Sequence, residues 1–518
     1  MENIAGKGLT SKGPPNLMND LDYKSWMKFQ KSFFRFSDLD SLLSDNILFF
    51  TKNQWSDGTF SRVLILENQK VYSPRSEYGS RDIHRLASFK SVNDIIDILR
   101  TESHSDRRYD FIFLDFRGIL TDRPDACSFV ETHSGAFSKL LREILKPEKY
   151  AGVLVDFQGE PSTAFPTPWL FALACRRYLR LRDEKIALVD SQQLPDANGA
   201  GTNQKERVVT GDTDYQNLYH LIFLQARDDE RKPLEPKHEY IRMAKNPPSI
   251  PAWLIVRSPP RKKDEKHHPA KFPEPLIEHF IETFTEPGET VFDPMAGTGS
   301  ALTAAARLGR NAVGMDIVQE FVDVARRRLA VWNPKPLEDW LASDDKNRCP
   351  RPKTEVLQGD ATGLSSDKRL GGRTFEYCIT SPPYWSVLKS HGSEYQKSRR
   401  DEALLQYYSD DPRDLGNIED YDRFMGTLQN VYNQVAEKLR SNGHLTVIVK
   451  NVKREQVVYP IAWDLVLLLT GEYGKYDYVG NTLWCQDDLK IRPFALGIYW
   501  TSNILHHFCI HLRKRSQH

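Results

Sequence analysis

A short run of side chains near residue 381 has the chemical types needed to hold a planar amine. The segment reads Thr-Ser-Pro-Pro-Tyr-Trp over residues 380–385. The hydroxyl of Ser381 and the backbone carbonyl of Pro382 can each accept a hydrogen bond from an amine N–H, and the two prolines fix φ and donate no competing N–H. The ring of Tyr384 offers a face for stacking. The predicted catalytic residues are Ser381, Pro382, Pro383 and Tyr384.

An exocyclic base amine is the substrate that best matches this turn. Such an amine is a poor nucleophile because its lone pair is delocalised into the ring, so preorganised acceptors that favour a pyramidal nitrogen promote its attack. Direct in-line attack on a sulfonium methyl requires mainly positioning of the reactants, with no covalent enzyme intermediate and no metal. A Pro-Pro turn at a strand end is also a common structural feature, so the interpretation depends on a second motif.

The second motif is a glycine turn between a predicted strand, 289–293, and a predicted helix, 301–308. Two glycines without Cβ atoms allow a tight turn, and a strand, turn and helix in this order cradle nucleotide-like ligands. The turn has no lysine of the GxxxxGK[ST] type, which argues against a nucleoside triphosphate. The predicted cofactor residues here are Asp293, Pro294, Met295, Gly297 and Gly299.

Carboxylates also end the next two predicted strands. Asp316 ends the strand 312–316, at the spacing from the glycine turn at which Rossmann-type folds bind ribose hydroxyls. Asp360 follows the strand 354–358, where it can accept a hydrogen bond from the amine of an adenine. Together with Asp293, these strand-end carboxylates favour a nucleoside cofactor over a plain structural turn.

The elements that position these motifs alternate between strand and helix, which predicts an α/β fold of the Rossmann-like type in the C-terminal half. A similar series of strand, helix, strand and final strand occurs earlier in the chain. The ranges are 109–116, 137–145, 153–157 and 218–224 in the first series, and 375–379, 424–439, 445–449 and 506–512 in the second. The N-terminal α/β region is therefore either a degenerate copy of the later half, with Asp-Phe-Arg-Gly at 115–118 in place of Ser-Pro-Pro-Tyr, or an unrelated α/β segment.

Length and composition set looser bounds. A chain of 518 residues, 40% hydrophobic and 27% charged, is too long for one ordinary domain. Shifts in composition predict an N-terminal α/β region at 1–228, a charged, proline-rich linker at 229–267 and a catalytic domain at 268–518. The six cysteines form no CxxC pair, no apolar run is long enough to span a bilayer, and the N-terminus lacks the apolar core of a signal peptide. These features predict a cytoplasmic protein without a structural zinc.

A net charge of +1 means that contacts with nucleic acid must come from local basic patches. A polar insertion at 389–411 follows the predicted catalytic turn and interleaves basic and aromatic side chains, as phosphates and unstacked bases require. A second basic run lies at 257–271, and either segment is equally compatible with a solvated loop. The predicted contacts are Lys397, Arg399, Arg400, Tyr395, Lys262 and Lys263.

The two motifs resemble those of the N4-cytosine and N6-adenine amino-methyltransferase family, which uses S-adenosylmethionine on DNA. The resemblance covers roughly residues 268–518. It implies that Lys271 and Pro273, which precede the glycine turn, lie over the methionine part of the cofactor, and Met295 stands where the family usually has phenylalanine. Serine in the first place of the catalytic turn, where many adenine enzymes carry aspartate, resembles the cytosine-N4 branch.

The resemblance implies transfer of a methyl group from S-adenosylmethionine to cytosine N4 in DNA, with S-adenosylhomocysteine as the second product, after the base has been rotated out of the duplex. By analogy it also implies a restriction-modification or phage-defence system whose nuclease or defence subunits are separate chains, and association with the nucleoid in a prokaryotic cell. The alternatives are adenine N6 in DNA, an amino group in RNA, and a non-catalytic methyltransferase-like subunit that binds nucleic acid. Residues 1–228 are expected to act as a recognition domain, a scaffold or a pseudo-methyltransferase.

Overall fold

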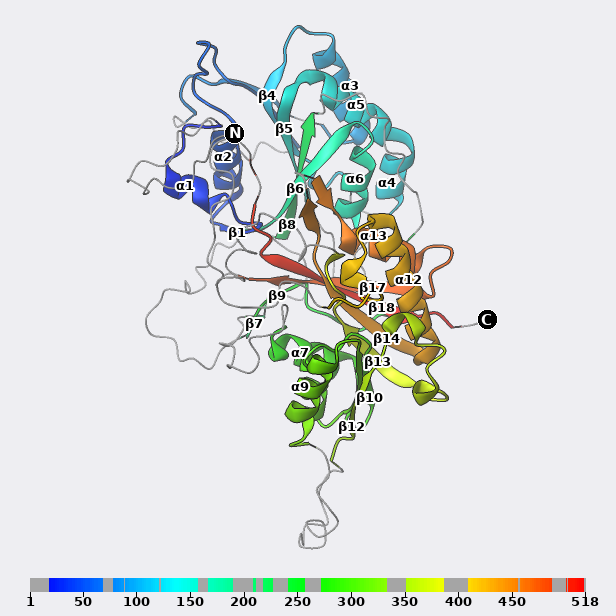
Figure 1. Cartoon of the computed structure of the whole chain (residues 1–518). Coiled ribbons are helices and arrows are strands. Elements are labelled where there is room, and N and C mark those ends of the chain that lie inside the picture. The colour runs from blue at the N-terminus through cyan, green and yellow to red at the C-terminus, as the bar shows by residue number, and fades with distance from the viewer. Residues whose placement is uncertain are drawn as a thin grey trace, which may run out of the picture.

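In the computed structural model, most of the chain forms two α/β halves, each built on one large sheet. The described residues are 18–68, 78–87, 89–120, 123–156, 166–189, 208–210, 218–226, 241–256, 272–332, 351–385, 409–454, 457–486, 500 and 502–516. In Figure 1 the N-terminal elements, blue to cyan, lie at one end, and the green helices α7 (Glu274–Phe284) and α9 (Gln319–Leu329) lie at the other. Among the described residues, no helix is both long and apolar enough to cross a bilayer.

The C-terminal half forms a sheet with the order β12-β11-β10-β13-β14-β18-β17-β9-β7. The strands are β7 (Val208–Thr210), β9 (Trp253–Val256), β10 (Thr290–Asp293), β11 (Asn311–Asp316), β12 (Thr354–Gln358), β13 (Phe375–Thr380), β14 (Leu439–Val449), β17 (Tyr476–Cys485) and β18 (His506–Lys514). Strands β10 to β14 run parallel, and β18 is antiparallel to both of its neighbours. This doubly wound, Rossmann-like order confirms the predicted fold class.

Helices cover both faces of this sheet. On one face lie α7, α8 (Ser300–Arg307) and α9, and on the other lie α12 (Tyr421–Lys438) and α13 (Ile461–Thr470). Because side chains alternate along a strand, Val291 packs in the first of these cores and its neighbour Phe292 in the second. Parallel strands buried on both faces are apolar along their whole length, which made their positions predictable from the sequence.

The N-terminal half forms a second sheet with the order β1-β6-β8-β5-β4-β2-β3. Its strands are β1 (Phe33–Phe36), β2 (Arg62–Glu67), β3 (Asp82–Ala87), β4 (Tyr109–Asp115), β5 (Leu145–Asp156), β6 (Leu179–Val189) and β8 (Leu218–Ala226). Its helices are α1 (Tyr23–Lys28), α2 (Leu39–Phe50), α3 (Val92–Ser103), α4 (Arg123–Ser128), α5 (Ser134–Ile144) and α6 (Thr167–Cys175), with a π-helical turn at Phe129–His133.

The two sheets correspond strand by strand. The series β3-β2-β4-β5-β8-β6-β1 matches β11-β10-β13-β14-β18-β17-β9 in order, in direction and in the sequence in which the chain visits the strands. The pairings also share their irregularities, because the register shifts at Tyr109 in β4 and at Phe375 in β13, and again at Leu181 in β6 and at Tyr478 in β17. The N-terminal half is therefore a structural copy of the C-terminal one.

The shared register shows what the N-terminal copy carries at the positions of the predicted site. Asp115 occupies the position of Ser381, as the sequence comparison predicted, and Ile65 occupies that of Asp293. The buried Asp115 carboxylate accepts two hydrogen bonds from the Arg117 guanidinium, at 2.8 and 2.6 Å. A carboxylate held in this way differs from the open pair of acceptors predicted at Ser381.

The predicted domain boundaries stay predictions. Strands β7 and β9 precede residue 268 in the chain, yet both pair with the C-terminal sheet. The two sheets also share a hydrophobic core, in which Trp169 of α6 stacks on Trp463 of α13 with ring centroids 6.3 Å apart. The halves therefore pack closely against each other.

Candidate active site

The carboxyl ends of β10 to β13 surround an open pocket of about 960 Å³, a volume that includes space shared with solvent. The predicted site residues that line it are Asp293, Pro294, Met295, Gly297, Asp316, Asp360, Ser381 and Pro383. The structure thus brings the glycine turn and the Ser-Pro-Pro-Tyr turn, which are far apart in the sequence, to one pocket.

Asp293 links these two turns. Its Oδ1 accepts a hydrogen bond of 2.7 Å from the hydroxyl of Thr380, the residue before Ser381, and one of 3.1 Å from the backbone N–H of Met295. Burial raises the pKa of Asp293 to about 7, although the hydrogen bonds from Thr380 and Met295 lower it. The carboxyl group therefore changes charge close to neutral pH and braces the start of the catalytic turn.

Asp316 holds the glycine turn in place. Its Oδ2 accepts the backbone N–H of Gly297 at 2.7 Å, and its Oδ1 accepts that of Val318 at 2.9 Å. Burial raises the pKa of Asp316 to about 6, against the lowering effect of these two hydrogen bonds. The side chain lies at the end of β11, where the sequence predicted a ribose ligand, and it lines the pocket.

The glycine turn requires its glycines. Gly297 and Gly299 have φ of +52° and +80°, a region that side-chain-bearing residues rarely adopt. A Cβ added to Gly299 would also lie 2.9 Å from the Cβ of Ala325 in α9. Gly299 is outside the pocket lining, so its role is to let α8 and α9 approach closely and to shape the turn.

Asp360 follows β12 and caps a short 3₁₀ helix (Ala361–Gly363), because its Oδ1 accepts the N–H of Thr362 at 2.8 Å. It lines the pocket beside apolar side chains that the sequence analysis missed, among them Ile317 and Phe321. Both residues come shortly after Asp316 in the chain. The signal that could have identified Phe321 is a large apolar side chain in the first turn of the helix that follows the strand-end carboxylate.

A second missed segment comes from the chain just before α12. Arg413, Asp414 and Leu415 line the pocket. The Asp414 carboxylate is buried and accepts hydrogen bonds from Gly416 N and Ser409 Oγ, both at 2.8 Å. An aspartate that caps a turn two residues before a glycine was visible in the sequence, but its spacing did not connect it to the pocket.

The catalytic turn leaves β13 at the pocket wall. Ser381 and Pro383 line the pocket, Pro382 is buried behind them and Tyr384 is half-buried. The Tyr384 ring has two neighbours outside the predicted site. The ammonium group of Lys450 lies 5.4 Å from its centroid and the ring of His507 lies 6.0 Å from it.

The end of the turn is anchored by Trp385. Its φ is +53°, and its indole N–H donates to the carbonyl of Glu419 at 3.1 Å. A buried tryptophan in a left-handed conformation is strained, and it persists because the surrounding contacts fix it. The rings of Tyr421 and Tyr459 lie 5.4 and 4.7 Å from the Trp385 ring and supply those contacts.

The remaining predicted residues fall into two groups. Pro273 is buried at the N-cap of α7, next to Phe272, which lines the pocket. Arg328 ties this region to the glycine turn, because it pairs with Glu274 and donates to the carbonyl of Thr298. The others lie outside the described residues: Lys271, Lys262, Lys263, Tyr395, Lys397, Arg399 and Arg400.

Comparison with curated proteins gives relatives that are named as methylases or methyltransferases. The putative methylase YubD of Escherichia coli K12 is 28% identical over 207 residues, which are 39% of this chain and 87% of that protein. The type II methyltransferase M.HinfI of Haemophilus influenzae is 30% identical over 125 residues, which are 24% of this chain and 35% of the enzyme. The chain thus spans only about a third of that enzyme.

Among solved structures, TrmN from Thermus thermophilus covers 57% of this chain and 57% of its own, with 10% identity and a TM-score of 0.27. A score this low supports no argument, so the fold assignment rests on the strand order. A family model described as DNA methylase, of the N6/N4 type, matches residues 18–327 and therefore reaches across the N-terminal copy, which the sequence motifs had left unplaced. More than half of the residues fit this model, and the glycine turn is among them: the chain belongs to the N6/N4 DNA methylase family, whose methyl donor is S-adenosylmethionine.

Proposed function

We propose that the protein is a DNA methyltransferase that methylates the exocyclic N4 amine of cytosine. The observation that carries this proposal is the meeting of Ser381 and the three strand-end carboxylates at one pocket. One part of that pocket has the residues of a nucleoside site and the other has acceptors for an amine. An enzyme that joins a nucleoside cofactor to a base amine needs both at one place.

The cofactor half of the pocket fits S-adenosylmethionine by the chemistry of its side chains. Asp316 binds the ribose hydroxyls, Asp360 accepts a hydrogen bond from the adenine amine, and Phe321 and Met295 supply apolar surface for the base. Lys271 and Pro273 hold the methionine part. S-adenosylmethionine supplies an activated methyl group on a sulfonium when it is bound.

The catalytic turn does the remaining work with protein atoms. The Ser381 hydroxyl and the Pro382 carbonyl accept the two N–H groups of the target amine, which directs its lone pair at the methyl group. Tyr384 stacks on the base, whose rotation out of the duplex costs a few kcal/mol. Contacts from the basic residues at 395–400 and 262–263 to DNA phosphates offset that cost.

Cytosine is favoured over adenine because serine, rather than aspartate, begins the turn. Adenine N6 in DNA is the alternative, since the same acceptors hold any planar amine. We place the enzyme in a restriction-modification or defence system in the cytoplasm, with any nuclease supplied by another chain.

Methyl transfer to mixed duplex DNA tests the proposal directly. Purified protein is incubated with labelled S-adenosylmethionine and DNA, and the digested nucleosides are identified by mass spectrometry. We expect N4-methylcytosine, and its loss in the Ser381→Ala variant while the Ser37→Ala control, a change at an exposed serine far along the chain, stays active. N6-methyladenine would refute the choice of base, and full activity of Ser381→Ala would refute the role of the turn.

A further inference from the structure

A cluster of buried charges lies where the N-terminal copy meets the catalytic half. Strand β6 carries four consecutive charged side chains from Arg182 to Lys185, each at most 3% exposed. In the shared register, Asp183 and Glu184 occupy the positions of Gly480 and Asn481 in β17. The acidic pair is therefore a feature by which the N-terminal copy departs from the active half.

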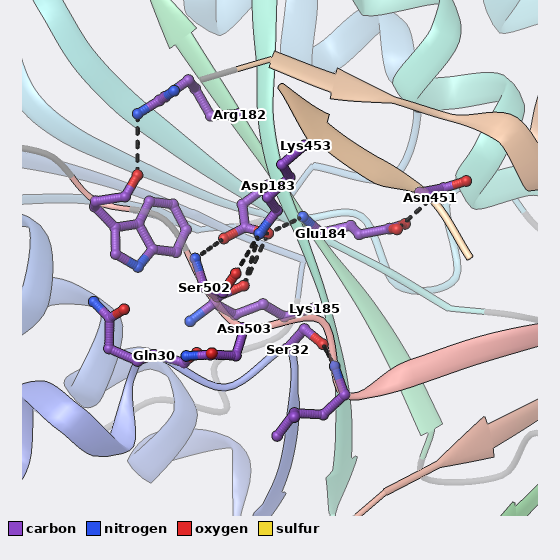
Figure 2. A network of polar contacts seen from close by, with 12 residues as sticks. Gln30, Ser32, Arg182, Asp183, Glu184, Lys185, Asn451, Lys453, Ser502 and Asn503 are labelled. Atoms are coloured by element: carbon purple, nitrogen blue, oxygen red, sulfur yellow. Dashed lines mark hydrogen bonds and ion pairs between the residues drawn. The ribbon is translucent and has the colours of Figure 1, made fainter. Parts of the chain in front are cut away.

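Both carboxylates reach across the junction to one short segment (Figure 2). Asp183 forms an ion pair with Lys453, and it also accepts hydrogen bonds from the N–H and hydroxyl of Ser502 at 3.2 and 3.1 Å. Glu184 accepts a hydrogen bond of 2.7 Å from the side-chain amide of Asn451. Residues 451 and 453 thus point into the N-terminal copy.

The same segment also touches the catalytic turn. Residues 450–454 and 457–459, the bridging hairpin, pair as β15 (Val452–Arg454) and β16 (Val457–Tyr459). At its ends, the Lys450 ammonium lies 5.4 Å from the ring of Tyr384 and the Arg454 guanidinium lies 5.0 Å from the ring of Trp385. The bridging hairpin is therefore held by the N-terminal copy on one side and contacts both aromatic residues of the turn on the other.

The buried charges of β6 are suited to fixing the position of the bridging hairpin. Buried ion pairs seldom stabilise a protein more than apolar packing of the same volume would, but they fix geometry when every partner is satisfied. Burial opposes ionisation of Glu184, yet a hydrogen bond of 3.1 Å from His220 and the nearby His506 ring, 3.6 Å away, hold its pKa at about 2, so the carboxylate is charged at neutral pH. Cations over aromatic faces in turn restrict the rings beneath them.

We propose that Asp183 and Glu184 are positioning residues for methyl transfer, which keep the bridging hairpin where its two cations fix the aromatic rings of the catalytic turn. The inference deepens the proposed function and rests on it. It gives the N-terminal copy a task in the reaction: one half of the chain supplies the chemistry and the other sets the geometry of the target-base side of the pocket.

The test compares kcat with the affinity for cofactor. The double variant Asp183→Asn with Lys453→Met removes the ion pair by neutralising both of its members, and Glu184→Ala removes the hydrogen bond to Asn451. We expect kcat for DNA methylation to fall about 10- to 100-fold, because small misplacements of reacting groups cost that much. Cofactor binding, measured by titration calorimetry, stays within about twofold, because the hairpin lies outside the cofactor half of the pocket.

Two further variants separate positioning from mere stability. Glu184→Gln keeps an oxygen that accepts from Asn451 and should retain most of the wild-type kcat. Tyr109→Phe is the stability control, since the buried Tyr109 hydroxyl donates to the Glu102 carboxylate at 2.6 Å within the N-terminal copy. It should lower the melting temperature and leave kcat unchanged.

The proposal is overturned if the folded double variant and Glu184→Ala, with cofactor binding intact, methylate DNA at the wild-type rate. Should either variant fail to fold, Arg454→Ala decides the matter, because Arg454 is exposed and its truncation leaves the junction intact. If the double variant Arg454→Ala with Lys450→Met then has the wild-type kcat, the inference is refuted. If the wild-type protein methylates no base at all, the proposed function fails and this inference fails with it. If the wild type and the variants are equally active, the proposed function stands and only this inference fails.

Discussion

Replacing Asp293 by asparagine should stabilise the cofactor-free protein at alkaline pH and leave its stability at acid pH almost unchanged. Both hydrogen bonds to Asp293, from Thr380 and Met295, reach Oδ1. An asparagine in the same rotamer presents its carbonyl oxygen there, so the substitution keeps both bonds and removes only the charge. The effect on stability therefore isolates the cost of a buried carboxylate.

The magnitude follows from the pKa. Burial raises the pKa of Asp293 from 3.8 to about 7, so the folded state binds the proton more tightly than the unfolded chain does. Stability from this group is fully present below about pH 4 and is lost as pH rises to about 7. The difference corresponds to about 4 kcal/mol as an upper limit, and we expect a gain of about 1–3 kcal/mol in Asp293→Asn at pH 8 because local relaxation reduces the cost.

Denaturant unfolding of wild type and Asp293→Asn at pH 5 and pH 8 measures this difference. The control is Asp323→Asn, which alters a half-exposed carboxylate on α9 and should change stability equally at both pH values. A gain in Asp293→Asn that is the same at pH 5 and pH 8, or a loss at pH 8, would refute the reasoning, because the predicted gain grows across the pH range between the unfolded pKa of 3.8 and the folded pKa of about 7.

Three other predictions concern the pocket and the residues that support it. Asp316→Asn, in contrast to the change at Asp293, should weaken S-adenosylmethionine binding more than about tenfold in calorimetry, because both carboxylate oxygens accept backbone N–H groups and an amide NH₂ would face the N–H of Gly297. Gly299→Ala should lower the melting temperature by several degrees, since a left-handed residue costs about 1–2 kcal/mol and its Cβ meets Ala325; Ala325→Gly should restore part of the loss. The charge of Lys450, whose pKa burial lowers to about 8, is lost as pH rises through that value, so the methylation rate of wild type should decline above about pH 8 and that of Lys450→Arg should not.

Local patterns made the core of the site predictable. The glycine turn and the strand-end carboxylates Asp293, Asp316 and Asp360 lie within one stretch of chain in which each strand is apolar, so the sequence itself gives their order along the sheet edge. The repeat of the two halves was also visible in the sequence, because both halves keep the same order of strands although the side chains of their turns differ. The sequence comparison therefore aligned Asp115 with Ser381, and the strand register agrees.

Residues brought in by tertiary packing were out of reach. Arg413 and Asp414 line the pocket from the segment that precedes α12, and no periodicity in the sequence encodes the path of that segment. The partnership of Glu184 and Asn451 joins residues 267 positions apart, on elements from different halves of the chain. Neither residue stands out in the sequence, since a charged side chain in a strand is usually at an exposed edge.

The buried acidic pair Asp183 and Glu184 gives a reason for the presence of the N-terminal structural copy. At the positions of Asp293 and Ser381, the N-terminal half has Ile65 and an Asp115 closed by Arg117, so the polar groups that would serve a second reaction are replaced or occupied. Its sheet nevertheless keeps the full strand order, which would be unnecessary for a simple linker. A sheet that retains its architecture and carries Asp183 and Glu184 in the strand that contacts the active half has the properties of a rigid support. Positional accuracy of about 1 Å at a reacting amine is worth as much in rate as an additional chemical group, which is a physical reason to retain a copy that positions the active half.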